Sequence, residues 1–152
     1  MGALLDHVRS YYESLNAGDA NAVAAHFTDD AVHYYTRREP QVGARAIAEN
    51  AALAVEHIEG RWKLEHAVEG EDEVAIEWTM AFDHPRTGRR CLDRGAEFLA
   101  FRDGKICEVR AYFHNGKRNR SGDLIGFDHK GRGHTVLEDA PAREPSRADA
   151  GS

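Results

Sequence analysis

Apolar residues recur every three or four positions from Ala3 to Ala17, which is the spacing of one face of a helix. Gly18 follows as a stop signal, and Asp19 is a suitable N-cap for a second, shorter helix. The apolar residues Val23 and Phe27 place that second helix directly after the cap. The pattern therefore predicts two consecutive helices at the start of the chain.

The helical spacing returns from Ala44 to Ile58 and predicts a third helix, which Gly60 follows. Beyond Gly60 the period changes from about 3.6 to 2, which is typical of strands that bury one face. The expected strands cover residues 62–68, 74–82, 90–102 and 105–114. In the first of them, the residues expected on one face are Trp62, Leu64, His66 and Val68. In the second, the even-numbered residues are large and apolar, so we expect them to face inward.

Three helices followed by a meander of strands indicate an α+β fold, in which helices cover one face of a curved antiparallel sheet. We expect one domain over residues 1–137. Within it, residues 114–137 are expected to form an extension that folds back over the domain, because they include Leu124, Ile125 and Phe127. Residues 138–152 contain almost nothing that could be buried, so we expect a disordered tail.

The charge and the cysteines exclude several classes of protein. The chain has 152 residues and a formal net charge of −6 with interspersed signs, which argues against a nucleic-acid partner. No segment approaches the roughly 20 apolar residues that span a bilayer, so no membrane partner is expected. Cys91 and Cys107 lack a CxxC spacing and lie in apolar surroundings, so we expect them to be reduced. These features favour a cytoplasmic location.

Candidate chemistry is concentrated on the strand from Cys91 to Phe101. If Leu99 and Phe101 point inward, then Asp93 and Glu97 do as well. A carboxylate that faces an apolar cavity is costly, so its pKa should rise towards the range of acid/base catalysis. Alternatively, a β-bulge at Gly95 would turn Glu97 to solvent, or Glu97 could form a structural ion pair. We expect Asp93 to lie closer to the rim and to be solvated.

Three strings in the chain carry a family resemblance: YYESLNAGDANAVAAHFTDDAV, VGARAIAEN and FRDGKICEVRAYF. They resemble the SnoaL-like branch of the NTF2-like superfamily over residues 4 to 114. The resemblance implies a cone in which helices and a curved sheet enclose one deep, mostly apolar pocket. It also implies a homodimer through the convex face of the sheet. That branch is associated with ketosteroid isomerases, polyketide cyclases, limonene-epoxide hydrolases and scytalone dehydratase.

Registering the chain on the ketosteroid isomerases implies two retained positions and one departure. The tyrosine of that family falls on Tyr11 and its protonated acid falls on Glu97. The base position falls on Tyr35, which has no carboxylate. A strand expected before the third helix has His33 and Tyr35 on one face and Val32 and Tyr34 on the other, and this alternation does not decide which face points inward. The resemblance implies that His33 and Tyr35 point inward. We therefore predict Glu97, His33, Tyr35 and Tyr11 as catalytic residues.

Registering the chain on the limonene-epoxide hydrolases argues against epoxide hydrolysis by the mechanism of that family. Their Asp–Arg–Asp triad falls on Trp78, Met80 and Ala111, so the groups that activate water are missing. The apolar residues at these three positions are instead expected to form part of the pocket wall. The predicted substrate-binding residues are Trp78, Met80, Asp93, Val109, Ala111 and Phe113.

No metal and no cofactor are expected. The nine histidines are scattered, no HExxH is present, and His129 and His134 flank only KGRG. That KGRG lacks the Lys–Ser/Thr pair of a phosphate loop, and no glycine-rich dinucleotide fingerprint follows a strand.

Three functional hypotheses remain. The first is a cofactor-independent isomerase, cyclase or lyase (dehydratase) that acts on a small, largely apolar organic molecule. The second is a non-catalytic module that binds a small molecule in the same cone. The third is a structural homodimer whose pocket is filled by its own side chains. The outer strip expected to pair in a homodimer contains Ala96, Phe98, Ala100 and Tyr112.

Overall fold

Three helices and six strands form the protein in the computed structural model, which describes residues 2–114 and 121–140. The helices are α1 (Ala3–Ala17), α2 (Ala20–Ala25) and α3 (Ala44–Ile58), and the bounds of α1 and α3 confirm the sequence prediction. The Asp19 carboxylate accepts a hydrogen bond from the backbone N–H of Ala22 at 3.1 Å and caps α2. Phe27 was expected on this helix, but α2 ends at Ala25 and Phe27 begins the first strand.

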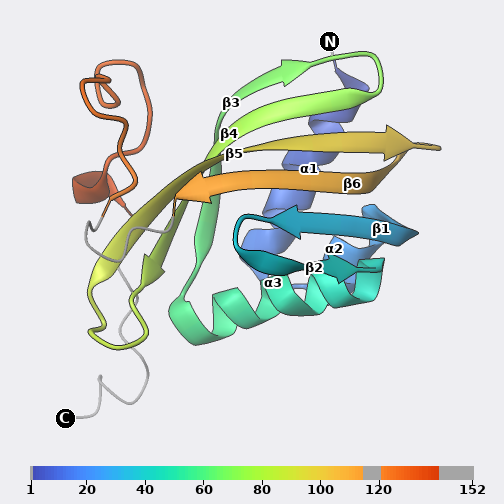
Figure 1. Ribbon diagram of the computed structural model, residues 1–152, viewed down its shortest axis with the longest axis horizontal. Coiled ribbons are helices and arrows are strands. Elements are labelled where there is room, and N and C mark those ends of the chain that lie inside the picture. The colour runs from blue at the N-terminus through green and yellow to red at the C-terminus, as the bar shows by residue number, and fades with distance from the viewer. Residues whose placement is uncertain (1, 115–120, 141–152) are drawn as a thin grey trace.

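The strands are β1 (Phe27–Tyr35), β2 (Arg38–Val42), β3 (Arg61–Glu69), β4 (Glu73–Asp83), β5 (Arg90–Arg102) and β6 (Lys105–His114). Their order in the sheet is β2-β1-β6-β5-β4-β3, and all neighbours are antiparallel except β1 and β6, which run parallel. Figure 1 shows the curved, open sheet in front of α1, with α3 along the edge formed by β1 and β2. This arrangement confirms the α+β cone.

The core lies between the sheet and the helices. Val8 and Leu15 of α1 and Ile47 of α3 are buried in the same cluster as Val74 and Ile76 of β4. The even-numbered residues of β4 therefore face inward, as their size predicted. The side chains on this face are removed from water, and together they can form the wall of a cavity.

Strand β3 departs from strict alternation. Its pairing with β4 shifts between Leu64 and His66, which indicates a β-bulge. Beyond that point the two faces exchange, so Ala67 packs against the core while Val68 is 60% exposed. The prediction that His66 and Val68 share a face with Leu64 was wrong because a period of two cannot reveal an extra residue.

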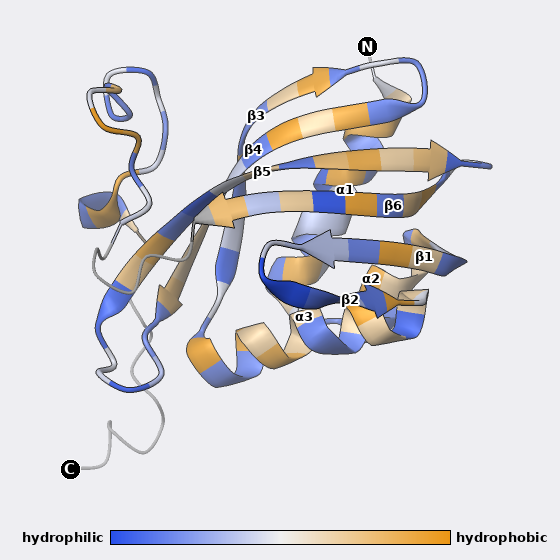
Figure 2. Ribbon diagram, in the orientation of Figure 1, coloured by the Kyte–Doolittle hydropathy of each residue, from blue (hydrophilic) through white to orange (hydrophobic). Residues whose placement is uncertain are grey.

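Strand β2 was missed by the sequence analysis. It consists of REPQV and is hydrophilic along most of its length (Figure 2). It lies at the edge of the sheet, where one side needs no partner and a proline is tolerated. An edge strand of this kind buries little, so it leaves no apolar alternation to detect.

Strand β5 pairs with β4 without interruption from Arg90 to Ala100. Gly95 is therefore not a bulge, and the alternative that turned Glu97 to solvent is excluded. Glu97 lies on the inner face with Leu99, as parity predicted.

Residues 121–140 contact the outer face of the sheet mainly through polar groups. The Arg94 side chain donates to Asp123 Oδ1 at 2.7 Å and to the Thr135 carbonyl at 2.6 Å. The expected apolar attachment was wrong for Leu124 and Ile125, since both are exposed. A 3₁₀ turn covers Leu137–Asp139 at the end of this segment.

Some sequence predictions reach beyond the described residues. The extension predicted at 114–137 includes residues 115–120, and the disordered tail predicted at 138–152 includes residues 141–152, which lie outside them. The domain boundaries stay a prediction. Both cysteines are free. Within the part of the chain that the structure describes, no helix is long and apolar enough to cross a membrane.

Candidate active site

A cavity of about 430 Å³ lies between the inner face of the sheet and helices α1 and α3. Its volume is within the roughly 300–1,000 Å³ typical of small-molecule sites. The four predicted catalytic residues all line it: Tyr11, His33, Tyr35 and Glu97. Five of the predicted substrate-binding residues also line it: Trp78, Met80, Asp93, Ala111 and Phe113. Val109 does not line this cavity, because its side chain is fully buried in the core.

Glu97 is the most deeply buried acid of the cavity, with 4% of its surface exposed. The hydroxyl of Tyr12 donates a hydrogen bond to its Oε1 at 2.6 Å. Burial raises the pKa of the Glu97 carboxyl to about 7, and the hydrogen bond from Tyr12 opposes that rise. The carboxyl can therefore both lose and accept a proton near neutral pH.

Tyr12, and not Tyr11, is the tyrosine that contacts this carboxyl. The Tyr11 ring packs edge-on against Phe27 with 5.1 Å between centroids, although Tyr11 also lines the cavity. The pKa of Tyr12 lies well above its usual value, first because of burial and then because of the Glu97 charge. Tyr12 remains a neutral donor at physiological pH. The family resemblance had instead placed the catalytic tyrosine at Tyr11.

His33 is buried, and its ring stacks on the ring of Tyr35. The two rings stack with 4.1 Å between centroids and 15° between planes, and the guanidinium of Arg38 lies 4.4 Å above the Tyr35 ring. Burial lowers the pKa of His33 to about 4, with a smaller effect from the Arg38 charge. His33 is therefore uncharged at neutral pH. Its Nδ1 finds no hydrogen-bond partner among the described residues.

Asp93 is a second inward carboxyl on β5, four residues before Glu97. It was expected to be solvated, but only 9% of it is exposed. Burial raises its pKa to about 6.

Gly95 lies between the two acids on β5 and pairs directly with Trp78 on the adjacent strand β4. A Cβ atom added there would lie 2.4 Å from Cζ2 of the Trp78 indole. The missing side chain at Gly95 thus makes room for the indole in the cavity wall.

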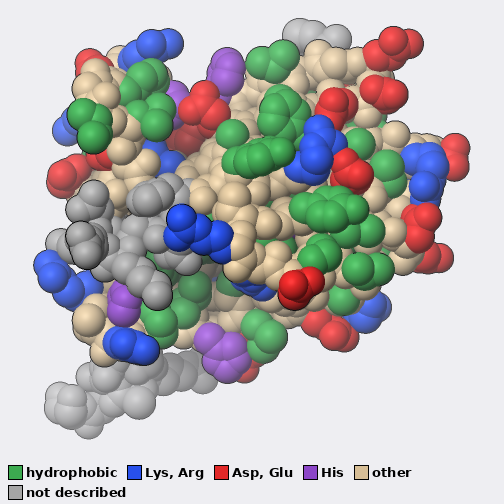
Figure 3. Space-filling model, viewed as in Figure 1, with side chains coloured by type: hydrophobic (Ala, Val, Ile, Leu, Met, Phe, Trp, Pro, Cys, Tyr) green, Lys and Arg blue, Asp and Glu red, His purple; other side chains and the backbone are tan. Residues whose placement is uncertain are grey.

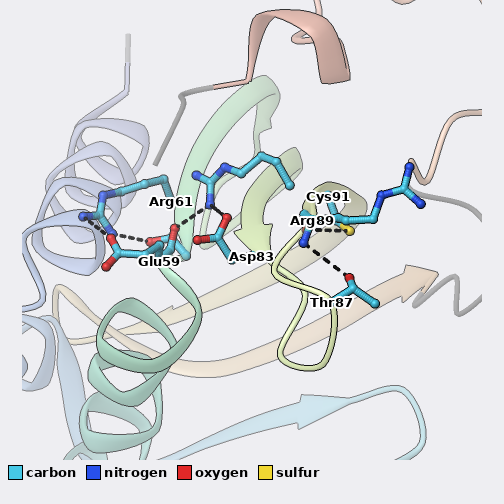
Figure 4. Close-up of polar contacts among 8 residues, drawn as sticks. Glu59, Arg61, Asp83, Thr87, Arg89 and Cys91 are labelled. Atoms are coloured by element: carbon cyan, nitrogen blue, oxygen red, sulfur yellow. Dashed lines mark hydrogen bonds and ion pairs between the residues drawn. The ribbon is translucent and has the colours of Figure 1, made fainter. Parts of the chain in front are cut away.

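The rim of the cavity is tied to the end of α3. The side chain of Arg90 donates to the Glu59 carbonyl at 3.1 Å and contacts Asp83 Oδ1 at 3.2 Å. Figure 4 shows Glu59 and Asp83 beside each other at this junction. The turn between β4 and β5 begins here, and His84 and Pro85 from this turn line the cavity. The network therefore fixes the turn at the rim relative to α3.

Three residues near the mouth were missed by the sequence analysis, together with Tyr12. They are Arg38, Asn50 and His84, and all of them line the cavity. Arg38 was hidden because it belongs to the unrecognised strand β2. No group of three or more potential metal ligands occurs within residues 2–114 and 121–140.

The comparisons with known proteins agree with this fold. A family model described as a SnoaL-like domain matches residues 8–109. Among solved structures, a protein of unknown function with a cystatin-like fold from Methylobium petroleophilum is 30% identical. The match covers 93% of this chain and 94% of that chain, with a TM-score of 0.64.

Two further solved structures are similar at lower identity. One is a protein with a ketosteroid isomerase-like fold from Catenulispora acidiphila in complex with trimethylamine (18% identity, 70% and 83% covered, TM-score 0.64). The other is an epoxide hydrolase/cyclase-like enzyme with a role in pyran ring formation in salinomycin (19% identity, 72% and 88% covered, TM-score 0.62). No match is found among curated proteins. The family match spans more than half of the chain, and this protein therefore belongs to the SnoaL-like branch of the NTF2-like superfamily.

Proposed function

We propose that this protein is a cofactor-independent acid/base enzyme that acts on a small, largely apolar organic molecule. The reaction class is isomerisation, cyclisation or dehydration. One observation carries the proposal: the buried Glu97 carboxyl faces the cavity, has a pKa near neutral and accepts a hydrogen bond from Tyr12. The SnoaL-like family match supports it.

Glu97 is assigned as the proton carrier. In its ionised form it takes a proton from a carbon next to a carbonyl group, and the electron pair of that C–H bond moves into an enolate. The proton then returns to another carbon in an isomerisation, or it leaves with a hydroxyl group as water in a dehydration. Tyr12 holds Oε1 throughout and so keeps the carboxyl in one orientation.

His33 is assigned as a neutral hydrogen-bond donor to the developing oxyanion. A histidine whose pKa is about 4 is a weak base, so we do not assign His33 as the general base. A neutral imidazole can still polarise a carbonyl group. Tyr35 and Tyr11 complete the polar part of the wall.

Proton abstraction can be tested without the natural substrate. The probe is 2-tetralone, an apolar ketone whose α-protons exchange with D₂O, and the exchange rate is followed by NMR. The Glu97→Gln variant should exchange the probe at least about tenfold more slowly than the wild type. Glu77→Gln, on an exposed residue of β4, serves as the control and should match the wild type. Equal rates for the wild type and Glu97→Gln would overturn the proposal and favour a non-catalytic binding module.

A homodimer through the outer face of the sheet is proposed as the assembly. Phe98 and Tyr112 are 37% and 56% exposed there. Figure 3 shows hydrophobic side chains gathered on this face, beside charged ones. Light scattering should give twice the mass of the chain, and Tyr112→Glu should give the monomer mass. A wild-type monomer at micromolar concentration would contradict this assembly.

A further inference from the structure

Arg38 lies at the mouth of the cavity because of a tight hairpin. Strands β1 and β2 are joined by two residues, and Arg38 pairs directly with Tyr35 across the turn. Arg37 in that turn has a φ of 61°, which brings the chain back on itself. The Arg38 guanidinium is thereby placed 4.4 Å above the Tyr35 ring, where the cation and the ring attract each other.

A second element fixes the same guanidinium. Arg38 Nη2 donates to Asn50 Oδ1 on α3 at 3.1 Å, and Asn50 Nδ2 donates to the Tyr35 hydroxyl at 3.3 Å. Arg38, Asn50 and Tyr35 thus form a closed ring of contacts between the hairpin and the helix. An arginine held in this way loses little conformational freedom when it binds a ligand.

Within residues 2–114 and 121–140, no acidic side chain neutralises the charge of Arg38. It is the only lysine or arginine among the described residues that line the cavity. No carboxylate in the described ranges forms an ion pair with it, whereas Arg90, Arg94 and Arg102 each pair with one carboxylate and Arg110 pairs with two. Within the described part of the chain, only Nη2 of this guanidinium forms a hydrogen bond, so the Nε and Nη1 donors can bind an anion.

We propose that the substrate carries a carboxylate that Arg38 binds at the mouth of the cavity. Guanidinium and carboxylate groups match in shape and form charge-assisted hydrogen bonds. The apolar body of the substrate fills the cavity, and its reactive carbon reaches towards Glu97. The approach of the reactive carbon to Glu97 rests on the proposed function, but the binding of the carboxylate by Arg38 does not.

The other charges of the cavity set the orientation. Asp93 and Glu97 both face the interior, so an anion placed there would meet two acids whose ionised forms repel it. Tyr35 and Asn50 at the mouth add no negative charge. The carboxylate of the substrate is therefore directed to Arg38, with the opposite end of the molecule inside.

The test compares two probes of nearly equal size and shape. 2-Naphthylacetate carries a carboxylate, and 2-naphthylacetamide is neutral. Their affinities are measured by calorimetry at pH 7.5 for the wild type, for Arg38→Met and for Arg38→Lys. The control is Arg9→Met, which removes an exposed arginine from α1.

The wild type should bind the carboxylate more tightly than the amide. Arg38→Met should weaken carboxylate binding by about fivefold, as expected for an exposed but well-oriented ion pair, and leave amide binding within about twofold. The carboxylate affinity of Arg38→Lys should lie between those of the wild type and Arg38→Met. Arg9→Met should bind both probes as the wild type does. A merely structural Arg38 would weaken both probes equally, and that result would overturn the inference.

The inference and the proposed function fail separately. Glu97→Gln should keep the preference for the carboxylate while it loses proton exchange on 2-tetralone. If the preference is absent in the wild type, the carboxylate inference is wrong even when exchange depends on Glu97.

Discussion

Two opposing influences act on the Glu97 carboxyl. Burial favours the protonated form, and the hydrogen bond from the Tyr12 hydroxyl favours the ionised form. Their balance leaves the pKa at about 7. A buried acid without that hydrogen bond would hold its proton more firmly, and a smaller fraction of it would be ionised at neutral pH.

Tyr12→Phe should therefore raise the pKa of Glu97 above that of the wild type. Proton exchange on 2-tetralone should reach its plateau at a higher pH, because the ionised form of Glu97 is the base. The pH profile of the exchange rate measures this change. Tyr11→Phe is the matched control and should shift the profile less, since no hydrogen bond joins Tyr11 to Glu97 in the described structure. An unchanged profile for Tyr12→Phe would show that the hydrogen bond does not act on the pKa.

Gly95→Ala should disturb the cavity wall. The added methyl would lie 2.4 Å from the Trp78 ring and 2.9 Å from Cβ of Phe113, so the indole has to move. Overpacking of this kind typically costs about 1–3 kcal/mol. Urea denaturation and tryptophan fluorescence would detect the loss of stability and the movement. Ala96→Ser, on the outer side of the same strand, should have little effect. A Gly95→Ala variant as stable as the wild type would contradict the contact.

The choice between Tyr11 and Tyr12 shows where sequence reasoning stops. The stripe of α1 through Val8, Tyr11 and Leu15 has helical spacing, but so does the stripe through Val8, Tyr12 and Leu15. Both tyrosines are buried. Only the position of β5 against the helix decides which hydroxyl meets Glu97, and that contact joins residues 85 positions apart.

Among the elements, those with a strong period were predicted with accurate bounds. The helices α1 and α3 and the strands β5 and β6 begin and end where the pattern indicated. Strand β2 and the bulge in β3 were missed, because one buries little and the other adds a residue without a change in composition. Because β2 was not predicted, Arg38 was not recognised as the cation at the mouth of the cavity.

Arg90→Met should loosen the junction between α3 and the β4–β5 turn. The Arg90 side chain bridges the Glu59 carbonyl and the Asp83 carboxylate, and its loss would leave Asp83 without this cation. We expect a loss of about 2 kcal/mol in the free energy of unfolding, since the pair is mostly buried. Urea denaturation measures it. Arg89→Met, at the exposed neighbouring position, should cost less than about 0.5 kcal/mol. Equal effects of the two variants would contradict a bridging role for Arg90.

At the scale of the whole molecule, the buried groups couple stability to pH. The pKa of Glu97 is about 7 in the native protein and 4.5 in its ordinary state. Between these values the unfolded chain loses a proton that the native chain keeps, so stability falls as pH rises. Asp93, raised from 3.8 to about 6, acts in the same direction. His33, lowered from 6.5 to about 4, acts oppositely, because the unfolded chain takes up its proton first as pH falls.

Glu97→Gln should remove the first of these contributions. The free energy of unfolding of the variant, relative to the wild type, should increase by about 3 kcal/mol as pH rises from 4.5 to 7. Above that range the difference should be constant. Urea denaturation at several pH values measures it, and Glu77→Gln, which changes an exposed acid of β4, is the control. A difference that does not vary with pH would mean that Glu97 titrates normally in the native protein.

The cavity itself was predicted from the family resemblance rather than from the residues. Strand parity placed Glu97 and Asp93 on the inner face, but whether that face meets packed side chains or open space depends on all the elements together. The inward direction of His33 and Tyr35 likewise came from the resemblance, and both residues line the cavity. Whether these residues are catalytic stays a prediction.

The uninterrupted pairing of β5 with β4 has a consequence for how this protein can change during evolution. Asp93 and Glu97 are four positions apart on one strand, which separates their Cα atoms by about 13 Å at roughly 3.3 Å per residue. Backbone geometry alone sets this separation, so a ligand that touches both acids is selected by its length. Inserting a single amino acid between them would rotate one acid to the opposite side of the sheet. Substitutions can therefore adjust the chemistry of this strand, whereas a change in its length would separate the pair.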